Sequence, residues 1–304
     1  MALQSSGAVK LSEIQTEFTG SNPISMSEYY RGAGYVTGNN TTVPTSGAIS
    51  VSNFYGTKRE FAFTISTSYT TTQDLRTLAL AAGWDGAAPV VATIASGVTI
   101  RGAAGVGAVS YEGSNNIPGS AGATGLTVTG SFPAGVSLIN NGTIYGGGGG
   151  GGGGGGTGQG GVGGAGGAAI VTTVALSITN NNVIGGGGGG GGGNSAWGTG
   201  GIVRSGGGGG GGAVYGEGGD GGQWPGIWGG PGGDGTETTG GAGGYNDQNY
   251  AVGGVGGARG AAGTTPYNYF NGSNGAAGGA GGAAVSGNSY VTWVATGTRY
   301  GALV

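Results

Sequence analysis

Long runs of glycine constrain this chain more than any other feature. Glycine is uninterrupted over 146–156, 185–193 and 206–212. Around these runs the pattern is Gly-Gly-X, so the non-glycine residues recur every third position. A period of three is neither the 3.6 of an α-helix nor the 2 of a strand. It is the period of a polyproline-II type helix, which rises about 3.1 Å per residue.

The Gly-Gly-X segments keep a strict phase. Their non-glycine positions are Val162, Ala165 and Ala168; Val255, Ala258 and Ala261; Ala277, Ala280 and Ala283; Glu217, Asp220 and Gln223; and Pro231, Asp234 and Glu237. Because such a helix has no internal hydrogen bonds, its backbone groups must bond to neighbouring segments. A segment surrounded by others has no room for Cβ atoms, whereas an outer segment can carry one outward column. We therefore predict a bundle of packed polyglycine-II helices, with the pure runs inside and the Gly-Gly-X segments at the edge.

Two other interpretations of the glycine were weighed. A flexible linker is the general alternative for a glycine-rich sequence, but the strict phase and the repeated aromatic interruptions argue against it. Collagen needs a sustained Gly-X-Y repeat rich in proline, and this chain of 304 residues contains 8 prolines and repeats Gly-Gly-X.

The composition excludes several classes of function. The formal net charge is −3 and only 9 residues are Lys or Arg, so nucleic acid, which is bound mostly through these residues, is not an expected partner. The chain has neither cysteine nor histidine, which removes the commonest general base, thiolate and metal ligands. No apolar run of transmembrane length and no signal peptide is recognised. We therefore expect no enzyme, no catalytic residue, no cofactor and no metal.

A short motif occurs three times within residues 1–57, at 9–14, 24–32 and 49–56. Each copy reads apolar-x-apolar-Ser-polar and then an aliphatic or aromatic residue. The serine is a good N-cap for a helical turn, and Ser12 with Gln15 is predicted to form a capping box. The motif predicts a small module of one-turn helices, which is either a self-contained structural domain or a docking module that attaches the chain to a larger assembly.

Residues 58–145 have the pattern of a β-rich region. Period-two alternation predicts a strand over 61–66, and Asp74 with Gly83 marks the ends of a short helix. Further strands are expected at 90–94, 98–100, 126–129, 136–139 and 143–145. Asn140-Asn141-Gly142 and the similar Asn180-Asn181-Asn182 each precede a glycine run, as a tight hairpin or as one coil of a β-solenoid.

These features predict a mostly β and irregular fold in three parts. The parts are a docking module at 1–57, a β-rich platform at 58–145 joined by 169–184 and 289–304, and a polyglycine-II bundle with aromatic loops at 146–288.

Aromatic residues gather where the glycine runs are interrupted. They are Trp197, Tyr215, Trp224, Trp228, Tyr245, Tyr250, Tyr267, Tyr269 and Phe270. Because a bundle without large side chains inside cannot bury them, they must cap its ends or face outward. Tyr and Trp among Asn, Ser and Gly are typical of adaptable recognition surfaces. We predict that these nine residues bind a receptor, and the alternative is that they only plug the ends of the bundle.

The glycine runs and aromatic loops over roughly 146–282 resemble the distal long-tail-fibre adhesins of T-even-like phages. Segments 74–84, 140–144 and 296–301 resemble parts of phage tail and virion proteins with glycine-rich ends. The resemblance implies a polyglycine-II sandwich on the virion surface, at the tail or tail-fibre tip, whose loops contact an outer-membrane protein or surface glycan of the host bacterium. The N-terminal module resembles the start of phage structural proteins and not that of the T-even adhesins. It is expected to bind virion structural proteins, and self-association of the chain is left open.

Three other functions remain as alternatives. The chain could be a non-adhesive structural or decoration protein of the virion surface. An ice-binding protein would need one broad face of small residues, which does not explain the aromatic loops. A surface depolymerase would need two carboxylates in a cleft, but the candidates, Glu217 with Asp220 and Asp234 with Glu237, lie three apart on columns that are expected to face solvent.

Overall fold

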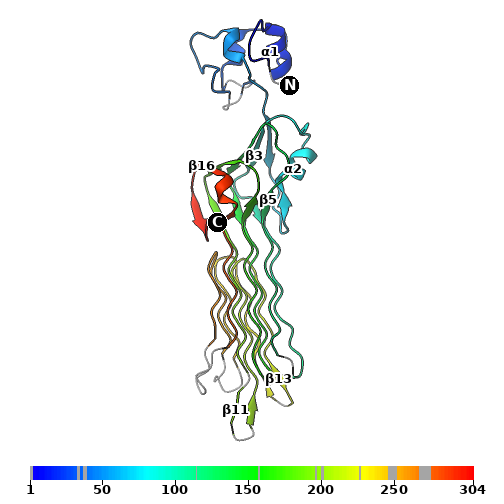
Figure 1. Cartoon of the computed structure of the whole chain (residues 1–304), viewed down its shortest axis with the longest axis vertical. Helices are drawn as coiled ribbons and strands as arrows, with labels where there is room; N and C mark the ends of the chain where they lie inside the picture. The colour runs from blue at the N-terminus through cyan, green and yellow to red at the C-terminus, as the bar shows by residue number, and fades with distance from the viewer. Residues whose placement is uncertain are drawn as a thin grey trace.

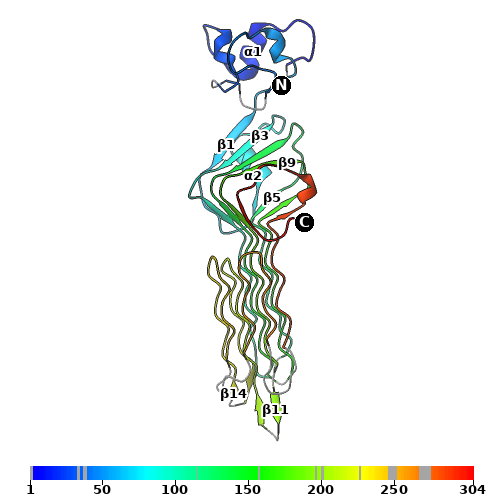
Figure 2. The same ribbon diagram turned by 90° about the vertical axis from the view of Figure 1, so that its left-hand side faces the viewer.

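The protein is elongated, with three regions following one another along its long axis (Figure 1). An N-terminal module lies at one end, a β-rich platform follows, and long glycine-rich segments run from the platform to the far end (Figure 2). This computed structural model describes residues 3–32, 35–36, 40–113, 115–156, 158–195, 197–199, 202–225, 227–245, 252–266 and 275–304, with backbone alone at 197–199, 202–204 and Trp224. Within these ranges, no helix has the length and apolar character needed to cross a bilayer.

The N-terminal module is built from three short helical turns around an aromatic core. The turns are α1 (Leu11–Phe18), η1 (Met26–Tyr29) and η2 (Val51–Phe54). The rings of Phe18, Tyr29 and Phe54 meet edge to face, with centroids 6.1–6.5 Å apart, and each side chain is at most 1% exposed. Each of the three helical turns therefore supplies one ring to a single small cluster.

The capping residues of this module differ from the prediction. Ser12 lies inside α1, and the N-cap is Lys10, whose backbone N–H donates to Glu13 Oε2 at 2.7 Å. In the third copy, the N–H of Ser50 donates to Asn53 Oδ1 at 2.8 Å. The Ser12 capping box is therefore wrong by two positions, because the second apolar residue of each copy already begins the helical turn.

The platform consists of three parallel sheets in the described part of the chain. The first sheet contains β1 (Phe61–Ile65), β3 (Val90–Ile94), β6 (Val136–Asn140), β9 (Leu176–Asn180) and β16 (Val291–Ala295) in that order. The second contains β4 (Thr99–Arg101), β7 (Thr143–Tyr145), β10 (Val183–Gly185) and β17 (Thr298–Tyr300). The third contains β2 (Gln73–Asp74), β5 (Leu126–Val128), β8 (Ile170–Thr172) and β15 (Val285–Ser286). The predicted mostly β and irregular fold is confirmed at this level.

The chain winds through the three sheets as a solenoid. Each coil takes one strand from the third, first and second sheet in turn, as in β5–β6–β7 and again in β8–β9–β10. Asn140 and Asn180 occupy equivalent corners, in register, and Asn140 Nδ2 donates to Asn180 Oδ1 at 2.8 Å. The hairpin alternative at Asn140-Asn141-Gly142 is wrong, since β6 and β7 belong to different sheets, and the solenoid alternative is confirmed.

Apolar side chains fill the inside of this solenoid. Its fully buried members include Leu75, Ile94, Ile100, Leu126, Leu138, Ile144, Ile170, Ile178 and Ile184. Apart from Leu75, they come from strands, and in the longer strands one side chain points inward and the next outward. The platform thus has its own core, separate from that of the N-terminal module.

The short helix predicted in the platform is confirmed as α2 (Leu75–Ala81). Asp74 is its N-cap, and Asp74 Oδ1 accepts a hydrogen bond from the N–H of Thr77 at 2.8 Å. Gly83 follows the last turn with φ +100°, a conformation that glycine adopts without steric cost. Leu75 and Ala79 anchor the helix in the core of the platform.

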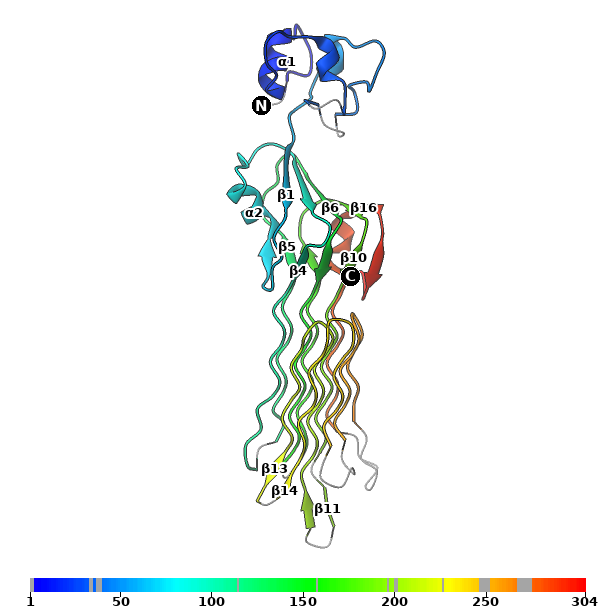
Figure 3. The same cartoon turned by 180° about the vertical axis from the view of Figure 1, so that it is seen from behind.

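All the glycine-rich segments leave the solenoid at the same corner, between the second and third sheets. The three excursions are 102–125 between β4 and β5, 146–169 between β7 and β8, and 186–284 between β10 and β15. Figure 3 shows them side by side beyond the platform. The first excursion was expected to be part of the β platform, but the N–H groups of Gly105 and Ala108 donate to Gly148 O and Gly151 O at 2.7 and 2.9 Å.

The hydrogen bonds of run 146–156 rotate among three neighbouring segments. The N–H groups of Gly147, Gly148 and Gly149 donate in turn to Ala123 O, Val214 O and Gly188 O, at 2.8–2.9 Å. Those of Gly150, Gly151 and Gly152 then donate to Ser120 O, Glu217 O and Gly191 O, at 2.7–2.9 Å. Every third residue therefore returns to the same neighbour.

The three pure glycine runs lie against one another. Gly152 N–H donates to Gly191 O, Gly191 N–H to Gly210 O, and Gly209 N–H to Gly152 O, at 2.7–2.9 Å. A Cβ atom added at Gly150 would fall on the carbonyl oxygen of Val106, which explains why no side chain is tolerated there. In contrast, Val162 and Val255 of the Gly-Gly-X segments are 49% and 47% exposed.

Candidate functional site

The two ends of the glycine-rich bundle differ in what they carry. Short turns at 213–216, 236–239 and 258–261 lie at the platform end. At the far end are two antiparallel hairpins, β11 (Trp197–Thr199) with β12 (Ile202–Arg204) and β13 (Gln223–Trp224) with β14 (Ile227–Trp228). The aromatic breaks at Trp197, Trp224 and Trp228 therefore fall at the end away from the N-terminal module.

Several far-end segments are joined through their backbones. Gly113 N–H donates to Gln223 O at 3.0 Å, which links the 111–113 turn to the β13–β14 hairpin. Gly230, just after that hairpin, donates its N–H to Tyr245 O. Segments that are far apart in sequence are thus joined at this end of the bundle, and the face that they form is called the end surface.

Exposed aromatic side chains lie on this end surface. Trp228 is 65% exposed and Tyr245 is 54% exposed. Tyr111, in the joined 111–113 turn, is 69% exposed and was not among the predicted site residues. The sequence could have indicated this residue, because Tyr111 is followed by Glu, Gly, Ser and two Asn, a composition like that of the other aromatic breaks.

Buried polar residues hold the end surface in place. Asn194 and Ser205, which flank the β11–β12 hairpin, are both fully buried. Asn194 Nδ2 donates to Val252 O at 2.9 Å, and Ser205 Oγ donates to Ile227 O at 3.0 Å. Each of these side chains therefore ties one far-end segment to another.

Several predicted site residues lie outside the described side chains. Trp197 and Trp224 are described in their backbone alone, within β11 and β13. Tyr250, Tyr267, Tyr269 and Phe270 fall outside the described residues. Of the predicted site residues, Trp228 and Tyr245 are therefore those whose described side chains lie on the end surface.

Tyr215 lies at the opposite end of the bundle from Trp228 and Tyr245. It sits in a turn with φ +64°, and its N–H donates to Thr236 O at 3.3 Å in the neighbouring turn. The guanidinium of Arg101, from platform strand β4, lies 4.7 Å from the centre of the Tyr215 ring. This cation–π contact joins a turn of the bundle to the platform.

A second arginine makes a similar contact nearby. The guanidinium of Arg259 lies 4.5 Å from the ring centre of Tyr145 and 5.5 Å from that of Tyr300. Arg259 Nη2 also pairs with Glu237 Oε1 at 2.8 Å. Burial raises the pKa of Tyr145 above its usual range, with Glu237 and Tyr300 adding to the shift and Arg259 opposing it.

Three of the four carboxylates named as catalytic candidates have other contacts. Glu237 pairs with Arg259 as described, Asp234 Oδ1 accepts from Gly218 N–H at 2.9 Å, and Asp220 Oδ2 accepts from Ser110 N–H at 3.3 Å. Within the described ranges, no three Asp or Glu residues come together in a group that could hold a metal ion.

The structure is thus a β-solenoid platform that carries a long glycine-rich bundle, with exposed aromatic side chains at the far end of that bundle. The chain belongs to the family of phage tail fibre adhesin Gp38, whose model matches residues 59–304. It is therefore a phage receptor-binding protein of the virion tail fibre, which confirms the resemblance and the location predicted from the sequence. The coarse prediction of an adhesive role is confirmed as well.

A solved structure supports the same fold. The chain is similar to one in the crystal structure of the gp37-gp38 adhesin tip complex of the bacteriophage S16 long tail fibre, with 24% identity, a TM-score of 0.55 and coverage of 100% of both chains. At this identity the likeness shows the fold alone. The search of curated proteins found no match to the chain.

Proposed function

We propose that this adhesin recognises an outer-membrane protein or surface glycan of the host through the loops at the far end of the bundle. The observation that carries the proposal is the joining of the exposed Tyr111, Trp228 and Tyr245 on one end surface. Aromatic side chains of this kind give a large contact area at a low entropic cost. Trp197, Trp224, Tyr250, Tyr267, Tyr269 and Phe270 belong to the same proposed surface by their positions in the chain.

Tyr215 is left out of the proposed receptor surface, because it contacts Arg101 of the platform at the other end of the bundle. Its role in the proposal is to anchor a bundle turn. Among the described residues, the cation–π contacts between bundle turns and the platform involve Tyr215 and Arg259 rather than Trp228 or Tyr245.

We further propose that the glycine-rich region is a bundle of polyglycine-II helices, in which the pure runs are central and the Gly-Gly-X segments peripheral. The proposal is supported by the rotation of hydrogen bonds among three neighbours with a period of three residues, which equals the three residues per turn of this helix. Such a lattice satisfies backbone groups without a folded core of side chains. It would hold the receptor loops at a fixed distance from the platform.

The receptor proposal is tested by competition for adsorption. Purified Trp228→Ala and Tyr245→Ala proteins are expected to block phage adsorption at least about 10-fold less well than the unchanged protein, since central aromatic residues carry much of the binding energy of an interface. Tyr290→Ala, at an exposed platform residue, is the matched control and should block normally.

The same assay identifies the class of receptor. Host strains lacking surface glycans and strains lacking individual outer-membrane proteins are compared, and the strain that no longer binds the purified protein names the class. Equal competition by Trp228→Ala, Tyr245→Ala and the control would overturn the placement of the receptor surface.

We propose that the N-terminal module attaches the adhesin to a tail-fibre protein of the virion. Each motif copy places a pair of apolar residues beside its helical turn, at Val9 and Leu11, Ile24 and Met26, and Ile49 and Val51. Val51 is exposed, and the other five pack partly against the core of the module and keep some exposure, so each copy offers a partly exposed apolar pair. In phage S16 the gp38 adhesin occurs in a complex with gp37, and a partner with three like chains would suit these surfaces.

The attachment proposal is tested with a recombinant C-terminal fragment of the long tail-fibre protein of the same phage. Replacing both apolar residues of one copy by serine is expected to weaken binding by a similar factor whichever copy is changed. Changing Ser66 and Ser68 to alanine on the platform provides the control. Loss of binding from one copy only would contradict a partner with three like chains.

A further inference from the structure

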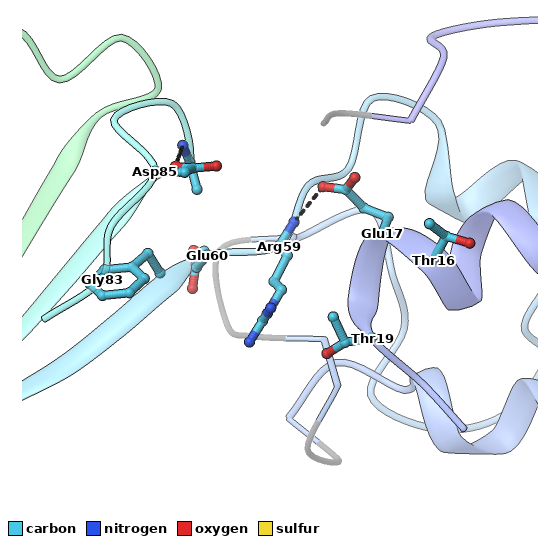
Figure 4. Close-up of a pocket in the computed structure, with 9 residues that line it drawn as sticks. Thr16, Glu17, Thr19, Arg59, Glu60, Gly83 and Asp85 are labelled. Carbon is cyan, nitrogen blue, oxygen red and sulfur yellow. Dashed lines mark hydrogen bonds between the residues drawn. The ribbon is translucent and has the colours of Figure 1, made fainter. Parts of the chain in front are cut away.

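The neck between the N-terminal module and the platform contains a cavity of about 340 Å³ (Figure 4). Thr16, Glu17 and Thr19 of the module form one wall, and Gly83, Asp85 and Ala88 of the platform form another. Arg59, Glu60 and Phe61 of the connecting chain complete the lining. A second cavity of about 510 Å³ adjoins the neck, and Glu60 lines it as well.

Glu60 has an unusual environment for a carboxylate. Its side chain is only 6% exposed, and its Oε1 has no hydrogen-bond partner among the described residues. Removing an ionised carboxylate from water is unfavourable unless a positive charge or hydrogen-bond donors compensate for it. The described part of the chain supplies no hydrogen-bond donor to Oε1.

The other two carboxylates of the cavity accept backbone hydrogen bonds. Glu17 Oε1 accepts from the backbone N–H of Arg59 at 3.0 Å. Asp85 Oδ1 accepts from the N–H groups of Ala87 and Ala88, both at 2.9 Å, and these bonds lower the pKa of Asp85. The lining thus carries three carboxylates and one guanidinium, so it has an excess of negative charge that suits a cationic group.

We propose that the neck cavity receives an arginine or lysine side chain of the tail-fibre partner, whose cation pairs with Glu60. The inference rests on the attachment proposed above and names a contact within it. A single buried carboxylate matches one guanidinium or ammonium group, whereas a calcium ion takes about six to eight oxygen ligands. Because the cavity has walls from both module and platform, its occupation would also fix the angle between them.

The test compares binding of the tail-fibre fragment to the full chain and to its Glu60→Gln variant. Glutamine keeps the size of the side chain and removes its charge. We expect binding to weaken about 30-fold or more, as when one partner of a buried charged pair is removed. The free variant is expected to unfold at the same or a higher temperature than the unchanged chain, since it no longer buries an unpaired charge.

Two further variants make the test specific. Glu60→Met removes the charge with an apolar side chain of similar length and should give the same loss of binding, so that the result does not depend on the folding of one variant. Glu112→Gln changes a carboxylate at the far end of the bundle and should bind the fragment normally.

The outcomes separate this inference from the attachment proposal. If the unchanged chain fails to bind the fragment, the attachment proposal fails. If the unchanged chain binds and both Glu60 variants bind equally well, only the pairing with Glu60 is overturned. If EDTA removes binding by the unchanged chain, the cation is a metal ion and the side-chain assignment is overturned.

Discussion

At the scale of single residues, the absence of a side chain at Gly150 determines how closely the glycine segments pack. An added Cβ would overlap the carbonyl oxygen of Val106 and approach the N–H of Gly107. At Ala165, on a peripheral Gly-Gly-X column, the side chain is exposed. The two positions therefore have opposite tolerance for substitution, although both lie in glycine-rich sequence.

We predict that Gly150→Ala lowers the free energy of unfolding by about 3 kcal/mol, because the backbone must shift to relieve the overlap. Ala165→Ser, the control, is expected to change it by less than about 0.5 kcal/mol. Differential scanning calorimetry of both variants checks this. Equal transition temperatures for the two variants would contradict the close packing of run 146–156.

A second prediction concerns Tyr29 in the core of the N-terminal module. Its hydroxyl is buried without a partner among the described residues, so Tyr29→Phe should raise the stability of the module by about 1 kcal/mol at pH 7. Burial, followed by Glu28 and Tyr35, raises the pKa of Tyr29. The neutral phenol is favoured in the folded state, so its contribution is present below about pH 10 and lost as the pH rises through the higher folded pKa.

The measurement for Tyr29 is urea unfolding, followed by near-ultraviolet circular dichroism at pH 7 and at about pH 10.5. The Phe variant should lose less stability between the two values than the unchanged chain. Tyr290→Phe, at a residue that is 50% exposed, should lose as much as the unchanged chain. A Tyr29→Phe variant that is less stable at pH 7 would show that the hydroxyl has a favourable partner.

The sequence predicts residue environments well where one local rule decides them. The phase of three correctly separated exposed Val162 and Val255 from the closely packed run 146–156. The phase of three does not show at which end of the bundle Tyr215 lies. That depends on the direction of its segment, which is set by the number of chain reversals before it. An aromatic residue after a glycine run has the same local pattern at either end of the bundle.

At the scale of elements, the corners of the solenoid depend on side chains that bond from coil to coil. Asn180 accepts from Asn140 Nδ2 at 2.8 Å and donates to Thr296 O at 2.9 Å. Both asparagines are at most 1% exposed. Each corner thus connects its own coil to the next, as the strands do through their parallel pairing.

We predict that Asn180→Ala destabilises the platform by about 2–3 kcal/mol, since it leaves buried polar groups of two coils without a partner. Asn181 is exposed, although its Nδ2 also bonds to Asn141 Oδ1 at 2.8 Å, and Asn181→Ala should cost less than about 0.5 kcal/mol. Thermal unfolding monitored by circular dichroism compares the two. A similar loss of stability in both variants would show that burial of the Asn140–Asn180 hydrogen bond is unimportant.

Element boundaries were predictable where capping chemistry or alternation is local, as at α2 and β1. The parallel pairing was not, because each strand pairs with one from another coil. Asn140-Asn141-Gly142 is an equally good signal for a hairpin and for a solenoid corner. Excursion 102–125 was not recognised as part of the bundle because it contains fewer glycines than the later segments, although Ala103, Val106 and Val109 keep the spacing of three.

At the scale of the whole molecule, the bundle is an insertion into the platform at one repeated corner. None of the buried residues of the platform core lies within 103–123, 147–167 or 187–282. Ala169 and Ala284, the last residues of two excursions, belong to this core, which takes no described side chain from the middle of the excursions. The bundle turns instead contact the platform surface through Arg101 and Arg259.

We predict that a chain in which all three excursions are replaced by short glycine-serine turns keeps a folded platform. Its circular dichroism should show a cooperative transition, and it should still bind the tail-fibre fragment but no longer compete for host adsorption. The full chain is the reference for both activities. An unfolded platform in the shortened chain would mean that the bundle supplies stability that the core lacks.

The arrangement of the three regions could be predicted only in part from the sequence. The resemblance and the glycine pattern predicted the adhesin class and a stalk, and the Asn-rich lead-ins marked two of the exits. That all exits share one corner depends on the winding of the solenoid, which requires every coil to be known. Glu60 could not have been singled out, because an isolated glutamate beside Lys58 and Arg59 resembles an ordinary solvated charge.

The rotation of hydrogen bonds with a period of three sets a rule for how such a tip can change length during evolution. An insertion of three residues, or nine nucleotides, adds about 9 Å to a segment and returns every later donor to its original neighbour. An insertion of one or two residues turns each later donor toward the wrong neighbour. Gene variation within the stalk should therefore occur in triplets of codons, matched between adjoining segments, while the far-end loops can vary by single codons.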